Sequence, residues 1–204
     1  MRRGSCARRT HGVGVSSSSY FCLPHLGGLP VPAMEMSFVH RTTDDSAPFE
    51  EDLASFARKG PLVIHTFPGI EWWADAPQVS DEDAAQACNF REHGSEFADL
   101  GYRILGITTQ PVGELHKWAR RERIRYSLLS DKGLRLADAL ALPTARHERE
   151  PVHQRPRHER LRVYQRLMLI VRDGRIIEVF YPVKEPDHAA EQVLSWLYQA
   201  ERGR

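Results

Sequence analysis

Hydrophobic and polar positions follow two alternating periods along the chain, and this pattern predicts strands interleaved with helices. Short apolar runs rich in β-branched residues predict strands at 62–67, 102–108, 126–129, 162–171 and 175–183. Apolar residues at helical spacing predict helices at 49–59, 83–100, 112–123, 133–142 and 187–200. The last two strands flank Arg172-Asp173-Gly174, a sequence that favours a hairpin turn.

The order of these elements predicts the fold class. A βαβ unit followed later by a ββα unit is the thioredoxin arrangement, so we expect a thioredoxin-like α/β three-layer sandwich with a mixed central sheet, over residues 45–200. Residues 144–160 are rich in His and Arg and almost devoid of apolar side chains, which predicts a charged surface loop.

The first 36 residues differ from the rest of the chain. Residues 1–34 contain no acidic residue, and a Ser run at 16–19 precedes a Pro/Gly-rich run at 23–32. Two hypotheses fit: an Arg- and Ser-rich targeting segment, or an upstream extension with the true start at Met34 or Met36. Residues 1–36 are therefore expected to be a disordered or mis-assigned extension.

Composition and charge exclude several classes of function. The 204 residues carry a net charge of +1, unlike a dedicated nucleic-acid binder. No apolar run is long enough to predict a transmembrane helix. The three cysteines, Cys6, Cys22 and Cys88, do not form a disulfide framework, so a reducing, cytoplasmic setting is expected. The His residues of the charged loop match no established metal-ligand spacing, and we predict no metal site.

Four segments in order resemble a peroxiredoxin of the alkyl hydroperoxide reductase/thiol-specific antioxidant family, closest to the bacterioferritin comigratory protein branch. They are TFPG at 66–69, ACNFREH at 87–93, LGITTQ with LLSD at 105–110 and 128–131, and YQRLMLIVRDGRIIEVFYPV at 164–183. The resemblance implies a peroxidatic thiolate at the start of the helix after the first strand, a resolving cysteine five residues later, and an arginine that holds the peroxide.

This chain departs from the family's pattern, Gly-Cys-Thr-x-x-Cys-x-Phe-Arg. Alignment on Cys88-Asn89-Phe90-Arg91 puts Cys88 at the resolving position and Asp83 at the peroxidatic one. The peroxide-holding arginine matches Arg166. The resemblance thus implies that the anion-binding arginine is present while the nucleophile is missing.

Asp83 and Cys88 each have two interpretations. Asp83 is either a helix cap that pairs with Arg166 or a general acid or base in an aromatic pocket. Cys88 is either a buried, inert thiol or the nucleophile of a one-cysteine enzyme. Five residues turn a helix by about 140°, so the two side chains point in different directions.

Three more positions near the predicted site carry candidate chemistry. His65, within an apolar strand, is either a core residue or part of an acid/base trio with Asp83 and Arg166. Phe67 and the tryptophan pair Trp72-Trp73 are candidate substrate-binding residues. The alternative for the pair is a loop that one of the two indoles anchors on the core.

We therefore expect a peroxiredoxin scaffold that serves as a small-molecule enzyme of a biosynthetic pathway, with acid/base chemistry in the old peroxide pocket and no cofactor. The alternatives are a thiol-dependent peroxidase that acts through Cys88 and a non-catalytic binding protein. The expected partners are a small-molecule substrate and a second copy of the chain in a homodimer, with no nucleic acid and no membrane.

Overall fold

The computed structural model describes residues 23–39, 47–69, 81–148 and 160–203. Seven strands form one sheet in the order β2-β1-β5-β4-β3-β8-β9, and β6 and β7 pair separately. The strands are β1 (Glu35–Val39), β2 (Phe49–Asp52), β3 (Leu62–Thr66), β4 (Arg103–Thr108), β5 (Ser127–Ser130), β6 (Thr144–Glu148), β7 (Arg160–Tyr164), β8 (Leu167–Arg172) and β9 (Arg175–Phe180). The helices are α1 (Leu53–Arg58), α2 (Asp81–Glu92), α3 (Gly94–Asp99), α4 (Val112–Arg121), α5 (Arg135–Leu140) and α6 (Ala189–Arg202), with 3₁₀ turns at Pro24–Leu26 and Pro186–His188.

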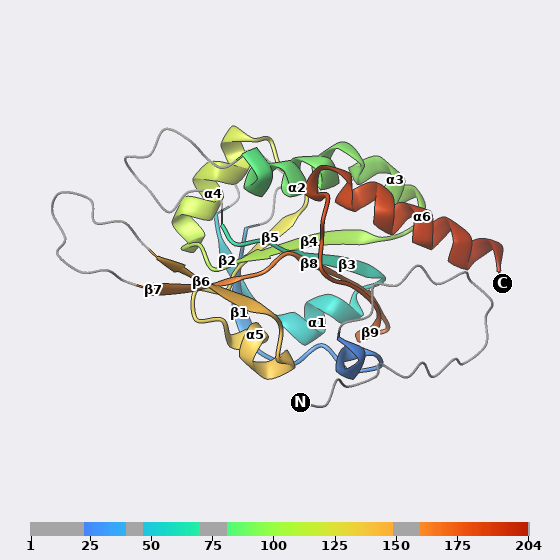
Figure 1. The fold of residues 1–204 in the computed structure, drawn as a ribbon, viewed down its shortest axis with the longest axis horizontal. Helices are drawn as coiled ribbons and strands as arrows, with labels where there is room; N and C mark the ends of the chain where they lie inside the picture. Colours follow the sequence, from blue (N-terminus) through green and yellow to red (C-terminus); the bar gives the residue numbers. More distant parts are fainter. Residues whose placement is uncertain (1–22, 40–46, 70–80, 149–159, 204) are drawn as a thin grey trace, which may run out of the picture.

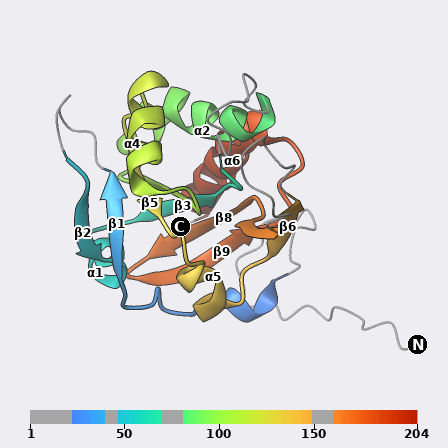
Figure 2. The same ribbon diagram turned by 90° about the vertical axis from the view of Figure 1, so that its left-hand side faces the viewer.

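The sheet is mixed. Strands β3, β4 and β5 are parallel to one another, whereas β8 pairs with β3, and β1 pairs with β5, in antiparallel fashion. Helices α2, α4 and α6 cover one face, and α1 and α5 cover the other (Figures 1 and 2). The predicted α/β sandwich with a mixed sheet is therefore confirmed.

Each face of the sheet has its own apolar core because strand residues alternate between the two faces. Ile64, Leu105 and Leu169 point to the side of α1 and α5. Val63, Met168 and Ile170 point to the side of α2, α4 and α6. All five residues of β3 are buried, as expected for a central strand covered on both faces.

Most predicted elements are present, with differences at their ends. The predicted helix at 83–100 is two helices that meet at His93, and the predicted strand at 162–171 is interrupted at Gln165 and Arg166. The N-terminal half of the predicted helix at 49–59 is strand β2. The ends of the predicted loop at 144–160 pair as β6 and β7, while residues 149–159 lie outside the described residues.

The fold begins earlier in the chain than the predicted boundary at residue 45. Strand β1 lies inside the sheet, and Leu26 and Val31 of the predicted extension are buried in the core of the α1 side. The backbone amides of Gly28 and Val31 donate to the carbonyl oxygens of Ile176 and Gly174, at 2.8 Å each. Within the described ranges, no helix combines the length and apolar character needed to cross a membrane.

Candidate functional site

The carboxyl end of β3 meets the beginning of β8, and this junction positions Arg166. The hydroxyl of Thr66 donates to the carbonyl oxygen of Gln165 at 2.7 Å and accepts from the amide of Leu167 at 3.2 Å. The side chain of Gln165 in turn accepts a hydrogen bond from the Tyr181 hydroxyl. These bonds fix the backbone on both sides of Arg166, whose side chain is partly buried.

The end of β4 closes the same edge of the sheet. The amide of Phe67 donates to the carbonyl oxygen of Ile107 at 3.1 Å, and the Thr109 hydroxyl lies 3.4 Å from the carbonyl oxygen of Pro68. Ligands of open α/β sheets bind at the carboxyl ends of the strands. The edge at Thr66, Thr109 and Arg166 is therefore the candidate site.

Phe67 lies beneath this edge and not on its surface. Its side chain is completely buried and packs in the core of the α2 side, at 5.4 Å from the His65 ring and 6.2 Å from the Trp118 ring between centroids. The predicted substrate contact would require exposed surface, which this ring lacks in the described structure. Phe67 forms part of the floor below the site.

His65 is also in the core. Its ring is fully buried, stacks on Phe90 at 4.5 Å, and places Nε2 3.1 Å from the hydroxyl of Tyr126. That hydroxyl donates to the carbonyl oxygen of Ala87, so Nε2 of His65 carries the proton that it shares with Tyr126. Burial lowers the pKa of His65 to about 3, which keeps the ring neutral at physiological pH.

Asp83 lies within the first turn of α2, which begins at Asp81. The amides at a helix N-terminus are free to bind an anion, and the helix dipole favours negative charge there. The backbone therefore places Asp83 at the N-terminal end of α2. The Asp83 side chain lies outside the described residues, as do Trp72 and Trp73.

Cys88 sits in the second half of α2, beyond the turn that carries unpaired amides. Its thiol is half-buried, and it is a free cysteine. Burial raises its pKa, Glu122 and Glu92 raise it further, and Arg91 only partly offsets them. Because the thiolate is the reactive form, this environment disfavours nucleophilic chemistry at Cys88.

The structure brings some of the predicted residues together. His65 and Phe67 stack in the core, and Arg166 lies beside the end of the strand that holds them. Tyr126 was not among the predicted residues, because nothing in its sequence context pairs it with a histidine 61 positions away. Across the described residues, no group of His, Cys, Asp and Glu side chains could hold a metal ion.

Comparison with protein families and solved structures identifies the family and the fold of this chain. The family described as AhpC/TSA matches residues 77–179, which is half of the chain. A Mycobacterium tuberculosis protein named as a peroxiredoxin is 38% identical over 72 residues, which are 35% of this chain and 42% of that protein. The chain thus matches less than half of the length of this relative. The Escherichia coli peroxiredoxin Bcp is 27% identical over 112 residues, covering 55% of this chain and 67% of the relative.

Solved structures show the same fold at low sequence identity. Peroxidoxin BcpB from Mycobacterium tuberculosis superposes with a TM-score of 0.61 at 23% identity, covering 85% of this chain and 96% of that one. Xanthomonas campestris peroxiredoxin Q gives a TM-score of 0.60 at 17% identity, covering 81% and 90% of the two chains. The thioredoxin-like peroxiredoxin fold therefore accounts for most of the chain.

Proposed function

Because the chain belongs to the AhpC/TSA family of peroxiredoxins, we propose that it uses the family's scaffold and its arginine without a peroxidatic cysteine. In this proposal Asp83 occupies the peroxidatic position, as the alignment on residues 88–91 indicates. Arg166 remains as the group that binds an oxyanion. The peroxide pocket then serves a reaction other than thiol-dependent peroxide reduction.

The environment of Cys88 is the observation that carries the proposal. It is the one cysteine in the part of the chain that the structure describes, and burial raises the pKa of its thiol. A peroxidase that depended on Cys88 would need a thiolate where the protein disfavours one.

We propose acid/base catalysis on a small organic molecule as the function of the pocket. Asp83, in the first turn of α2, would transfer the proton, and Arg166 would hold a carboxylate or a developing oxyanion of the substrate. The bonds of Thr66 and Tyr181 to Gln165 support this role, since they hold the Arg166 backbone in place before a ligand binds. We assign His65 to the floor of the site because it is neutral and enclosed.

A peroxide-consumption assay tests the proposal directly. Hydrogen peroxide and cumene hydroperoxide are supplied with dithiothreitol or thioredoxin as reductant, and the wild-type chain is compared with Cys88→Ser. We expect no turnover from either protein. Turnover by the wild type that disappears in Cys88→Ser would contradict the proposal and would make the chain a one-cysteine peroxidase.

Replacing Asp83 by cysteine tests whether Asp83 occupies the family's peroxidatic position. Asp83→Cys places a thiol in the first turn of α2, where the helix N-terminus lowers thiol pKa values. We expect this variant to gain peroxide turnover, and a further Arg166→Gln substitution to lower that rate about 100-fold. A folded Asp83→Cys variant without turnover would argue against the assignment of Asp83 and Arg166 to one pocket.

A further inference from the structure

A cavity lined by arginine side chains lies away from the site at Arg166. Its volume is about 390 Å³, and Arg91, Arg123 and Arg125 line it. Volumes of about 300–1,000 Å³ are typical of small-molecule sites. Among the described residues these three arginines form the lining, and the Glu92 carboxylate pairs with Arg91 from outside it.

The sheet register separates this cavity from Arg166. Ser127 pairs with Leu105, and Leu105 pairs with Ile64, so Arg125 is level with the beginning of β3. Arg166 lies just beyond the other end of β3, where Thr66 pairs with Leu167. At about 3.3 Å per residue, the two positions are about 16 Å apart along the strand direction.

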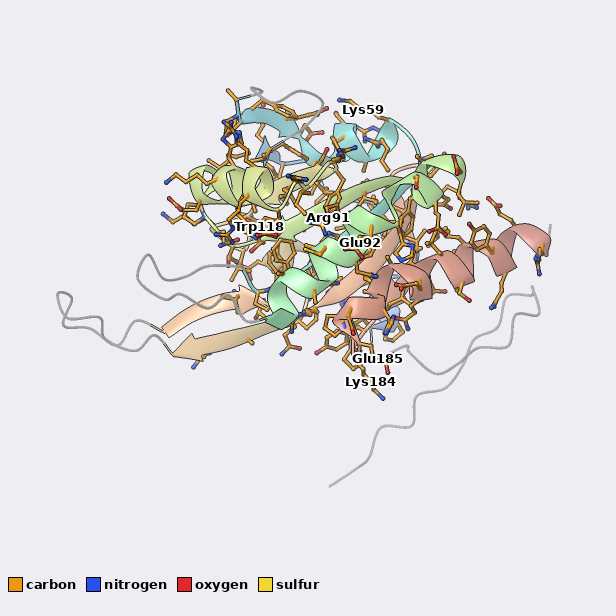
Figure 3. The ribbon with its side chains drawn as sticks, turned by 90° about the horizontal axis from the view of Figure 1, so that it is seen from above. Lys59, Arg91, Glu92, Trp118, Lys184 and Glu185 are labelled. Atoms are coloured by element: carbon orange, nitrogen blue, oxygen red, sulfur yellow. The ribbon has the colours of Figure 1, made fainter. Side chains whose placement is uncertain are left out.

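Arg91 is held in place by the carboxyl end of α4. Its Nη1 donates to the carbonyl oxygen of Glu122 at 2.6 Å, and its Nη2 donates to the Glu92 carboxylate at 2.9 Å. In Figure 3, Arg91 and Glu92 are labelled on α2, with α6 running alongside. A guanidinium has five N–H donors, so Arg91 keeps donors for a ligand after making these two bonds.

Arg123 occupies a backbone position that favours glycine. Its φ is 54°, in the left-handed region, directly after the end of α4. The amide of Ile124 donates to the Ala119 carbonyl oxygen at 2.9 Å, which completes the helix-terminating motif in which glycine is common at this position. An arginine here costs backbone free energy that a glycine would avoid, and side-chain packing does not offset it, since Arg123 is exposed.

Arg123 and Arg125 have no carboxylate partner within the part of the chain that the structure describes. Among the described residues, neither makes an ion pair, and the nearby Glu122 carboxylate accepts from Nε of Arg121 at 2.9 Å. Three guanidinium groups around one cavity repel each other, and a cleft lined by a single sign of charge concentrates ions of the opposite sign. The Glu92 carboxylate offsets the charge of Arg91, so an excess of positive charge remains at Arg123 and Arg125 that an anion would balance.

We propose that this cavity binds the phosphate group of a small phosphorylated molecule. Guanidinium groups match phosphate oxygens with paired hydrogen bonds, and a phosphate dianion offers three oxygens to three arginines. A carboxylate offers two oxygens and one charge, so it satisfies the cavity less well. The site is independent of the reaction proposed at Arg166.

Isothermal titration calorimetry with inorganic phosphate and with pyrophosphate tests this proposal on the full chain at constant ionic strength. We expect saturable binding at one site per chain, with acetate, a single carboxylate, as a comparison that binds more weakly. Arg125→Gln should weaken phosphate binding about tenfold, since a hydrogen bond to a charged group is lost. Arg120→Gln is the matched control: Arg120 is exposed on α4 and does not line the cavity, so its affinity should stay within about twofold.

Arg123→Gly separates a binding role from a structural one. Glycine suits the left-handed backbone, so the melting temperature without phosphate should stay the same or rise, while phosphate affinity falls about tenfold. Absence of saturable binding to the wild type, an equal loss of affinity in Arg120→Gln, or unchanged affinity in Arg123→Gly would each overturn the proposal. Tighter binding of acetate than of inorganic phosphate would overturn the assignment of phosphate as the ligand class.

Discussion

His65 makes the stability of this fold sensitive to acid. The imidazole is enclosed between Phe90 and Gly106, and in the described structure its one hydrogen-bond partner is the Tyr126 hydroxyl. Burial lowers its pKa from 6.5 to about 3. Below pH 6.5 His65 therefore binds a proton in the unfolded chain but stays neutral in the folded chain. The free energy of unfolding decreases for this reason as the pH falls towards 3.

The size of this effect follows from the two pKa values. Each unit of pKa difference corresponds to about 1.4 kcal/mol, so the full shift from 6.5 to about 3 lowers the free energy of unfolding by about 5 kcal/mol at low pH. Between pH 7.5 and pH 5 the proton linkage of one such histidine costs about 2 kcal/mol. No correction for solvent screening applies, because the side chain has no exposed surface.

Urea unfolding at a series of pH values measures this contribution. We compare the wild type with His65→Leu, which is similar in volume and cannot titrate. The absolute stability of the variant does not matter: the wild type should lose about 2 kcal/mol more than the variant between pH 7.5 and pH 5. Equal pH dependence in both proteins would refute the reasoning and would restore His65 as a titrating acid/base group.

His93 supplies a control of opposite sign. Burial lowers its pKa, but bonds to Glu96 at 2.6 Å and to Glu191 at 3.3 Å outweigh burial and raise it. Protonated His93 therefore adds stability that is present below pH 6.5 and is lost as the pH rises through its folded pKa. His93→Gln should steepen the loss of stability in acid, whereas His65→Leu should reduce it.

Three further substitutions test the packing around the site by urea unfolding. Asp131→Ala removes the acceptor of the Tyr164 hydroxyl and of two amides in α5, and should cost about 3 kcal/mol; a loss below about 1 kcal/mol would contradict the bonds. Asn89→Ala removes the 2.6 Å cap on the first turn of α6 and should cost about 1 kcal/mol, with no change expected if α6 is capped by solvent. Gly106→Ala should lower the free energy of unfolding by about 2 kcal/mol, because its Cβ would lie 2.7 Å from Leu128. An unchanged stability would mean that the neighbouring side chains move aside without loss.

The fold was predictable from the sequence because its signals are local. The β-branched run of β3 and the hairpin between β8 and β9 are clear in the pattern of residues, and both are confirmed. Strand β1 was missed because it follows a Pro/Gly-rich run and was grouped with the N-terminal segment. The last helix begins later than predicted: Asp187 lies in a 3₁₀ turn, and Asn89 of α2 supplies an acceptor for the first turn of α6.

The site was less predictable because its contacts are long-range. The sequence marked Arg166 as a binding residue, but the Thr66 bonds that fix its backbone join residues about a hundred positions apart. His65 was weighed as a catalytic group from its place in the strand, whereas burial and Tyr126 determine its charge state. The arginine cavity was missed for the same reason, since α2 and the turn after α4 meet only in the folded chain.

Four residues of the ACNFR segment of α2 make contacts that hold the fold together. The carbonyl oxygen of Ala87 accepts from Tyr126, Asn89 caps α6, Phe90 stacks on His65, and Arg91 holds the end of α4. None of these contacts requires a reactive thiol. Membership of the family therefore shows the scaffold, and the chemistry proposed at Asp83 and Arg166 is a separate proposal that Asp83→Cys and Cys88→Ser test.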